Sequence, residues 1–189
     1  MKTLSHKITI YLIDNDILSK DKYDWAIYYF QKKIFCTICL LFIISICSFT
    51  FPIDITLIYI ATFLKLRQHT GGYHCNNYIQ CFFLSIIISY ITIYAIINTN
   101  ISSLKYIIIL LFAAIYIIFK YAPVNHINIH LNKQEYEALK QKMKIVVKFL
   151  LSLSIFILFI NKTYFICIIY SFIVDAVLIL LSIQLKQYI

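Results

Sequence analysis

The stretch from Arg67 to Cys81 gathers most of the residue types in this chain that could carry out chemistry. It holds the chain's single arginine, both of its glycines, two of its five histidines and two of its six cysteines, in the order RQHTGGYHCNNYIQC. A cysteine acts as a nucleophile when a base removes its proton and when hydrogen-bond donors stabilise the oxyanion that its attack creates. The composition of this stretch therefore indicates thiol chemistry supported by an imidazole.

Cys81 and His74 are the residues that we expect to form a catalytic pair. Cys81 opens a long apolar run, so it should lie near the N-terminus of a helix, where free N–H groups and the helix dipole favour a thiolate. It follows His74 by seven residues, a separation that rises ~10.5 Å on a continuous helix, beyond hydrogen-bond reach. The pair therefore predicts a break in the helix between Gly72 and Cys81, and Gly71 and Gly72 permit a sharp turn there.

Two other interpretations of this stretch stay open. Cys75 is a competing nucleophile, but it adjoins His74 in the sequence, and adjacent side chains usually point apart. His69 and His74 together with the two cysteines are residue types that bind zinc, although their spacing lacks the paired short intervals of familiar zinc motifs. We therefore predict a site without a metal and a chain without a cofactor, and keep zinc binding as an alternative.

A few residues elsewhere have types that suggest chemistry. His126 and His130 could share one helix face, but no further ligand accompanies them, so we interpret them as part of a polar loop. Cys36 and Cys39 have the spacing of a redox pair, yet they lie in apolar sequence, where a thiol usually acts as a small hydrophobe.

Asp175 is the one acidic residue well inside an apolar segment. A carboxylate at membrane depth is expensive, and it is usually neutralised, paired or placed against a water-filled cavity. It could orient a catalytic histidine, receive a substrate group or, in its protonated form, make a hydrogen bond between helices. The last interpretation is favoured, and Asp175 is kept among the supporting residues of the site.

The composition places these residues in an integral membrane protein. Hydrophobic residues make up 62% of the 189 and charged residues 13%, with a mean hydropathy of +0.84, which is more apolar surface than a soluble fold of this size can bury. We predict an all-α fold, because helices satisfy their own backbone hydrogen bonds in lipid. About six hydrophobic helices are expected, of which the second is short and is tilted, interfacial or re-entrant. They cover residues 34–51, 53–66, 82–98, 104–120, 145–160 and 164–185.

The distribution of positive charge predicts the orientation. If all six segments cross, fifteen of the 17 lysine and arginine residues fall on one side, and only Lys105 and Lys162 fall on the other. Because cytoplasmic loops carry an excess of positive charge, both termini and residues 67–81 should be cytoplasmic. Without a crossing by the second segment most of this asymmetry would vanish, so the pattern favours an even number of crossings before residue 67.

We interpret residues 1–189 as a single polytopic membrane domain with three polar regions. Residues 1–31 form a cytoplasmic or interfacial region, in which Leu4, Ile8 and Leu12 at helical spacing predict a short amphipathic helix. Residues 67–81 would be a cytoplasmic loop that holds the catalytic pair, and residues 121–144 a basic cytoplasmic loop. The net charge of +9 suits anionic partners, and we expect contact with the lipid bilayer but no nucleic-acid partner.

The motif resembles the signature of the accessory gene regulator B (AgrB) family, membrane cysteine endopeptidases that process quorum-sensing propeptides. That signature contains an arginine, a Gly-Gly-x-His and a cysteine seven residues after the histidine. In this chain these positions fall on Arg67, Gly71, Gly72, His74 and Cys81.

A second landmark of the family is similar to the tripeptide at residues 121–123, so the resemblance covers nearly the whole chain. The family's acidic residue and Lys-Pro after this landmark are absent, and Val124, Asn125 and His126 follow instead. The role of this loop therefore stays open.

The resemblance implies a mechanism. His74 would act as the base for Cys81, which would cleave a peptide bond near the C-terminus of a propeptide and form an acyl-enzyme thioester. A cysteine or serine of the propeptide would then attack the thioester and close a thiolactone or lactone ring. Arg67 would attract the acidic tail of the propeptide, and Gln68 or Gln80 would donate to the oxyanion.

The resemblance also implies partners and a location. The family's propeptides carry an amphipathic leader and an acidic tail, and its members work as homodimers in the bacterial cell membrane. Two functions of other classes stay as alternatives. A small peptide or solute transporter would depend on Asp175 rather than on Cys81, and a zinc-binding membrane protein would hold a metal on the histidines and cysteines of the motif.

Overall fold

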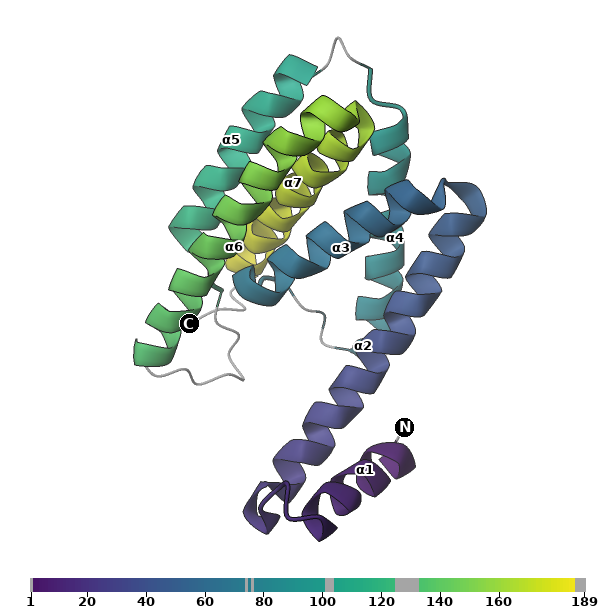
Figure 1. Cartoon of the computed structure of the whole chain (residues 1–189), viewed down its shortest axis with the longest axis vertical. Coiled ribbons are helices and arrows are strands. Elements are labelled where there is room, and N and C mark those ends of the chain that lie inside the picture. The colour runs from purple at the N-terminus through teal and green to yellow at the C-terminus, as the bar shows by residue number, and fades with distance from the viewer. Residues whose placement is uncertain (1, 74, 76, 101–103, 125–132, 186–189) are drawn as a thin grey trace. The chain divides into compact units, whose positions relative to one another are not determined.

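The computed structural model describes residues 2–73, 75, 77–100, 104–124 and 133–185 of the chain (Figure 1). Within these residues the regular structure is entirely helical. The elements are α1 (Lys2–Asp14), the 3₁₀ helix η1 (Lys20–Lys22), α2 (Tyr23–Thr50), α3 (Ile53–Thr70), α4 (Tyr78–Ile97), α5 (Leu104–Tyr121), α6 (Lys133–Ile160) and α7 (Lys162–Gln184). They divide into two compact units, Met1–Ile46 and Cys47–Ile189, which we describe separately.

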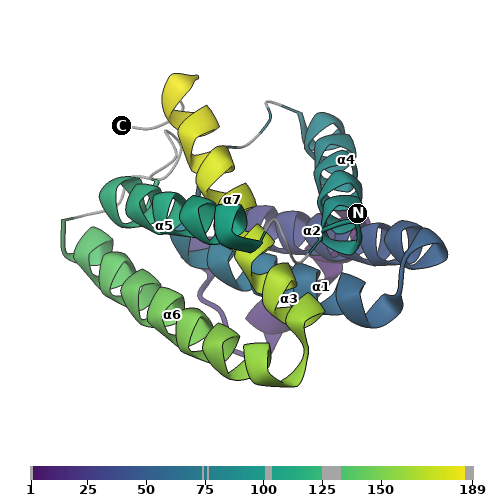
Figure 2. The same cartoon turned by 90° about the horizontal axis from the view of Figure 1, so that it is seen from above.

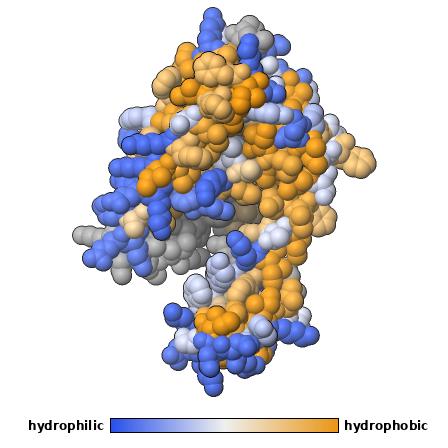
Figure 3. All heavy atoms as spheres, viewed as in Figure 1, coloured by the Kyte–Doolittle hydropathy of each residue, from blue (hydrophilic) through white to orange (hydrophobic). Residues whose placement is uncertain are grey.

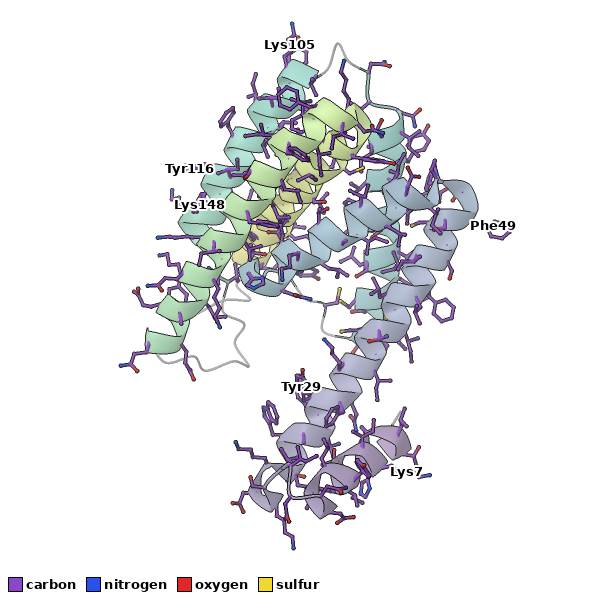
Figure 4. The ribbon with its side chains drawn as sticks, in the orientation of Figure 1. Lys7, Tyr29, Phe49, Lys105, Tyr116 and Lys148 are labelled. Carbon is purple, nitrogen blue, oxygen red and sulfur yellow. The ribbon has the colours of Figure 1, made fainter. Side chains whose placement is uncertain are left out.

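The first unit contains α1, η1 and most of α2. The short helix expected at the N-terminus is confirmed as α1. Its His6 Nε2 shares a hydrogen bond of 2.6 Å with the Tyr23 hydroxyl at the start of α2. Trp25 stacks on Tyr29 with 5.4 Å between ring centroids, and both rings are exposed (Figure 4).

The second unit is built around α7. This helix buries most of its residues and packs against α3, α4, α5 and α6, which surround it (Figure 1, Figure 2). The outer helices instead expose large apolar side chains, so that much of the visible surface is hydrophobic (Figure 3). Phe49 near the end of α2 and Tyr116 on α5 point away from the helices (Figure 4), as expected of residues that face lipid.

Hydrogen bonds between side chains connect α3 and α7 at three levels. The Tyr164 hydroxyl donates to Asp54 Oδ2 at 2.7 Å, the hydroxyls of Thr62 and Ser171 lie 2.8 Å apart, and the Thr70 hydroxyl lies 3.0 Å from Asp175 Oδ1. Residue numbers increase in the same direction on both helices, so α3 and α7 run parallel. Parallel neighbours begin at the same end of the bundle and finish toward the same end.

The same hydrogen bonds show how far α3 reaches. From Asp54 to Thr70 the chain rises ~24 Å along α3, whereas from Tyr164 to Asp175 it rises only ~16 Å along α7. The helix α3 is therefore inclined to α7, as Figure 1 shows. It ends at Thr70 beside Asp175, near the middle of α7, whereas α7 continues to Gln184.

Five stretches within the described residues are long and apolar enough to cross a membrane: Lys20–Thr50, Ile79–Ile97, Leu104–Tyr121, Gln134–Ile160 and Lys162–Gln184. The chain is thus an all-α membrane protein, as predicted. These stretches coincide with five of the six expected segments. The sixth, residues 53–66, lies within α3, which is as long as α5 but is not among the five stretches. Its tilted, interfacial or re-entrant character stays a prediction.

The boundary of one element differs from the expectation. Residues 133–144 were expected in a loop, but they form the first turns of α6, which continues without interruption to Ile160. The segment contains no proline or glycine to end the helix. Met143 and Val147 are fully buried, so one face of this polar part packs on the protein and stabilises the extension. The basic residues of this region therefore project from a helix.

Candidate active site

The backbone between α3 and α4 is not helical, which confirms the break predicted between Gly72 and Cys81. Helix α3 ends at Thr70, α4 begins at Tyr78, and the described residues between them adopt no helical conformation. Gly71 and Gly72 have φ values of +70° and +115°, which side chains of L-residues rarely allow. The two glycines therefore turn the chain sharply away from α3.

Both glycines also lie against other groups. A Cβ on Gly71 would lie 2.5 Å from the Val124 carbonyl oxygen, and one on Gly72 would collide with the Arg67 guanidinium. Gly71 and Val124 form an isolated parallel bridge, and the Val124 N–H donates to the Thr70 carbonyl at 2.8 Å. Val124 directly follows the landmark at residues 121–123, in which Ala122 and Pro123 are buried. The structure thus brings the two landmarks of the sequence into contact.

The Arg67 side chain is hydrogen-bonded to the backbone of the turn. Its Nη1 and Nη2 donate to the carbonyl oxygens of Gly71 and Tyr73. Burial lowers the pKa of Arg67, while the nearby Asp175 and Cys81 side chains oppose that shift, and an arginine stays charged in either case. Since these two nitrogens are engaged by the protein's own backbone, the same pair is not free to grip a substrate carboxylate. The substrate contact that the resemblance implies for Arg67 stays a prediction.

Helix α7 supports the turn from the other side. The Thr70 hydroxyl contacts Asp175 Oδ1 at 3.0 Å, and the Tyr73 N–H donates to the Leu178 carbonyl at 3.2 Å. Thr70 and Asp175 are completely buried. The structure shows a hydrogen bond between helices at Asp175, with Thr70 as its partner, and this places the carboxyl group against the last residue of α3.

Cys81 lies in the first turn of α4, as predicted. Its N–H donates to the Asn77 carbonyl at 3.0 Å, while the Asn77 side chain makes no capping hydrogen bond. The amides of residues 78–80 precede this first intrahelical bond, and they are the ones a helix leaves for other acceptors. Cys81 is half-buried, so its sulfur combines partial access with the positive end of a helix.

Cys75 has a different environment. Its thiol interacts with the Tyr73 hydroxyl and with the Cys81 side chain. Burial raises the pKa of Cys75, and the hydrogen bond from Tyr73 opposes that shift only in part. The same hydrogen bond raises the pKa of Tyr73. A raised thiol pKa leaves less thiolate at neutral pH, which agrees with ranking Cys75 below Cys81.

Several predicted residues are not brought together by the described part of the chain. His74, His126 and His130 lie outside the described residues, so the His74–Cys81 pair stays a prediction. Gln68 on α3 and Gln80 on α4 are exposed, and their role as oxyanion donors is also untested. Within residues 2–73, 75, 77–100, 104–124 and 133–185, no three histidine, cysteine or acidic side chains gather as metal ligands.

Sequence reasoning missed Thr70, Tyr73, Val124 and Leu178. All four contribute through backbone groups or a hydroxyl, and their partners are distant in the chain. One signal in the sequence could have pointed to these residues. The tripeptide at residues 121–123 resembles a family landmark, and its structural role was not evident from the sequence.

Helices around a central α7, with a half-buried cysteine at the start of a helix that follows a glycine turn, define a polytopic all-α membrane protein with a partly accessible thiol. The family model described as Accessory gene regulator B matches residues 5–188. The chain therefore belongs to the AgrB family, and membership supports a role in autoinducer processing. Neither the comparison with curated proteins nor that with solved structures found a match.

Proposed function

We propose that this protein is a membrane-embedded cysteine endopeptidase that cleaves an autoinducer propeptide near its C-terminus and promotes its cyclisation. The observation that carries the proposal is the family match over residues 5–188 together with the place of Cys81. This thiol lies in the first turn of α4, half-buried, with the Arg67 guanidinium close enough to interact electrostatically. Positive charge and helix amides are the groups that stabilise a thiolate and an oxyanion.

The reaction proceeds in two exchanges at one carbonyl carbon. His74 takes the proton of Cys81, whose sulfur attacks the scissile carbonyl. His74 then gives this proton to the amide nitrogen, the C–N bond breaks, and the amine leaves with the tail. A thioester joins the remaining peptide to Cys81. A thiol or hydroxyl of that peptide next gives its proton to His74 and attacks the same carbonyl, which breaks the thioester, closes the thiolactone or lactone and releases the Cys81 sulfur to be protonated again.

The half-buried position of Cys81 favours cyclisation over hydrolysis. Exclusion of water protects reactive acyl intermediates. The nucleophile that closes the ring belongs to the same peptide as the thioester, so it has the advantage of proximity over bulk water.

We infer that the site opens to the cytoplasm. The starts of α5 and α7, with Lys105 and Lys162, lie at the end of the second unit opposite the turn (Figure 4). The end that carries the turn also holds Lys120 and the basic start of α6, so the positive side is the side of the site. Exposed lysines on the first half of α6, Lys142 and Lys144, would attract the acidic tail of the propeptide. A homodimer in the bacterial cell membrane completes the proposal.

Alkylation of individual cysteines in native membranes tests the proposal. We expect iodoacetamide to label Cys81 faster than a reference thiol introduced by Glu137→Cys on the exposed start of α6, and His74→Ala to remove the difference. Cys81→Ala should abolish cleavage of the propeptide, while a transporter would survive that change and respond to Asp175→Asn. Ordinary labelling of Cys81, or rapid labelling only after a chelator, would overturn the peptidase proposal.

A further inference from the structure

The turn that precedes His74 is held by a small set of contacts whose common support is one face of α7. Asp175 and Leu178 lie three residues apart, so they share a face of that helix. The first contacts Thr70 through Oδ1, and the second accepts the Tyr73 N–H. The two ends of the segment from Thr70 to Tyr73 are therefore fixed on the same helical turn.

The carboxyl group of Asp175 has a second oxygen that its contact with Thr70 does not use. Its Oδ2 is buried and has no hydrogen-bond partner among the residues that the structure describes. Arg67 lies three residues before Thr70 on α3, and therefore on the same side of that helix. Its two terminal nitrogens donate to the carbonyls of Gly71 and Tyr73. A completely buried carboxylate at this position is costly, and a purely structural contact to a hydroxyl would not require a charge.

We propose that Asp175 is a positioning residue of the reaction: it fixes Thr70 through Oδ1, serves as the counter-charge of Arg67, and so sets the path of residues 71–73 into His74. The inference rests on the proposed function, because it concerns the delivery of the base to Cys81. It assigns Asp175 no contact with the substrate.

The chain provides a matched control for this role. Thr62 and Ser171 form a hydrogen bond of 2.8 Å between the same two helices, and both are buried. The substitution Thr62→Val removes a hydroxyl contact of the same kind as Thr70→Val does, but away from the turn. A general loosening of α3 on α7 would affect the two variants alike.

The experiment compares wild type, Thr62→Val, Thr70→Val, Thr70→Ser and Asp175→Asn in purified, detergent-solubilised protein. For each we would measure the rate of Cys81 alkylation relative to the same variant with His74→Ala, its pH profile, and kcat and KM for propeptide cleavage. We expect Thr70→Val and Asp175→Asn to lose most of the His74-dependent acceleration and to lower kcat by about tenfold or more with little change in KM, as misplacement of a catalytic group does. Thr70→Ser should restore both readouts, and Thr62→Val should stay within about twofold of wild type.

The outcomes separate the two proposals. If wild-type Cys81 shows no dependence on His74, the proposed function fails. If that dependence exists and persists undiminished in Asp175→Asn and Thr70→Val, the proposed function stands and the positioning role is overturned. Equal losses in Thr62→Val and Thr70→Val would also overturn it, because they would show only helix packing. Should Thr70→Val not fold, the comparison of Thr70→Ser with Asp175→Asn decides by the same readouts.

Discussion

The two ends of the α3–α7 pair are connected by hydrogen bonds of similar length in opposite surroundings. At one end the Tyr164 hydroxyl reaches an exposed Asp54 carboxylate at 2.7 Å. At the other end Thr70 and Asp175 meet at 3.0 Å, both completely buried, beside Arg67 and two glycines with positive φ. At the exposed end, water screens the charge and can take the place of a lost hydrogen-bond partner. At the buried end it cannot. The buried end should therefore be the sensitive one.

The substitution Gly72→Ala should break the buried end most severely. A Cβ at this position collides with the Arg67 guanidinium, and the φ of +115° is unfavourable for alanine, so the turn must move. We expect propeptide cleavage to fall by roughly 100-fold or more, the effect of displacing a catalytic group by about 1 Å. Cleavage kinetics and the His74-dependent alkylation of Cys81 measure this. Asn98→Ala, in the connection after α4 where φ is negative, is the control, and equal damage by both would contradict the explanation.

Arg67→Lys should have the next largest effect. A lysine keeps the charge opposite Asp175, but it is a point donor that does not reproduce the fork with which Arg67 binds two carbonyls. Since hydrogen bonds of a charged group contribute ~1.5–3 kcal/mol each, loss of one predicts a fall in kcat of about 10- to 100-fold. Retention of full activity would show that charge alone matters at this position. The matched control is Lys65→Arg, because Lys65 is exposed and lies only two residues before Arg67 on α3.

The contrast between the two ends also explains which features could be predicted from the sequence. Apolar runs and the glycine pair predicted the helices and the break before Cys81, because each depends on neighbours in the chain. The helical conformation of residues 133–144 was not predicted. A polar stretch is interpreted as a loop unless the burial of Met143 and Val147 is known. The contact of Gly71 with Val124 and the hydrogen bonds of Arg67 to the turn depend on how the chain folds. The local sequence pattern does not specify them, so they could not be predicted.

Alkylation of Cys75 tests the surroundings of the turn that follows the buried end of α3. Burial raises the pKa of this thiol, so its labelling rate should reach half-maximum above the ~8.5 of an ordinary cysteine. The Tyr73 hydroxyl stabilises the thiolate, and Tyr73→Phe should therefore shift the midpoint still higher and slow labelling at neutral pH. Mass spectrometry of each cysteine across a pH series measures both effects, with the thiol of Glu137→Cys as reference. A midpoint of Cys75 below that reference would contradict the raised pKa.

The exposed end should respond least, and its response should depend on pH with a definite sign. The hydrogen bond from Tyr164 lowers the pKa of Asp54 below its ordinary value. A lowered pKa in the folded state means that the contact stabilises the protein above the ordinary value of ~3.9 and loses that contribution as the pH falls through the folded value. Tyr164→Phe should therefore lower the midpoint of thermal unfolding slightly at neutral pH, and the difference from wild type should vanish in acid.

Asp54→Asn should reproduce this small change, and the double variant should add nothing further, because both substitutions remove the same hydrogen bond. Neither should alter the His74-dependent alkylation of Cys81, which reports on the other end of α3. A loss of that reactivity in Tyr164→Phe would mean that α3 transmits strain along its whole length. The buried end would then not be an independent support of the turn, and the positions of Thr70 and Asp175 would have to be understood as part of one rigid helix pair.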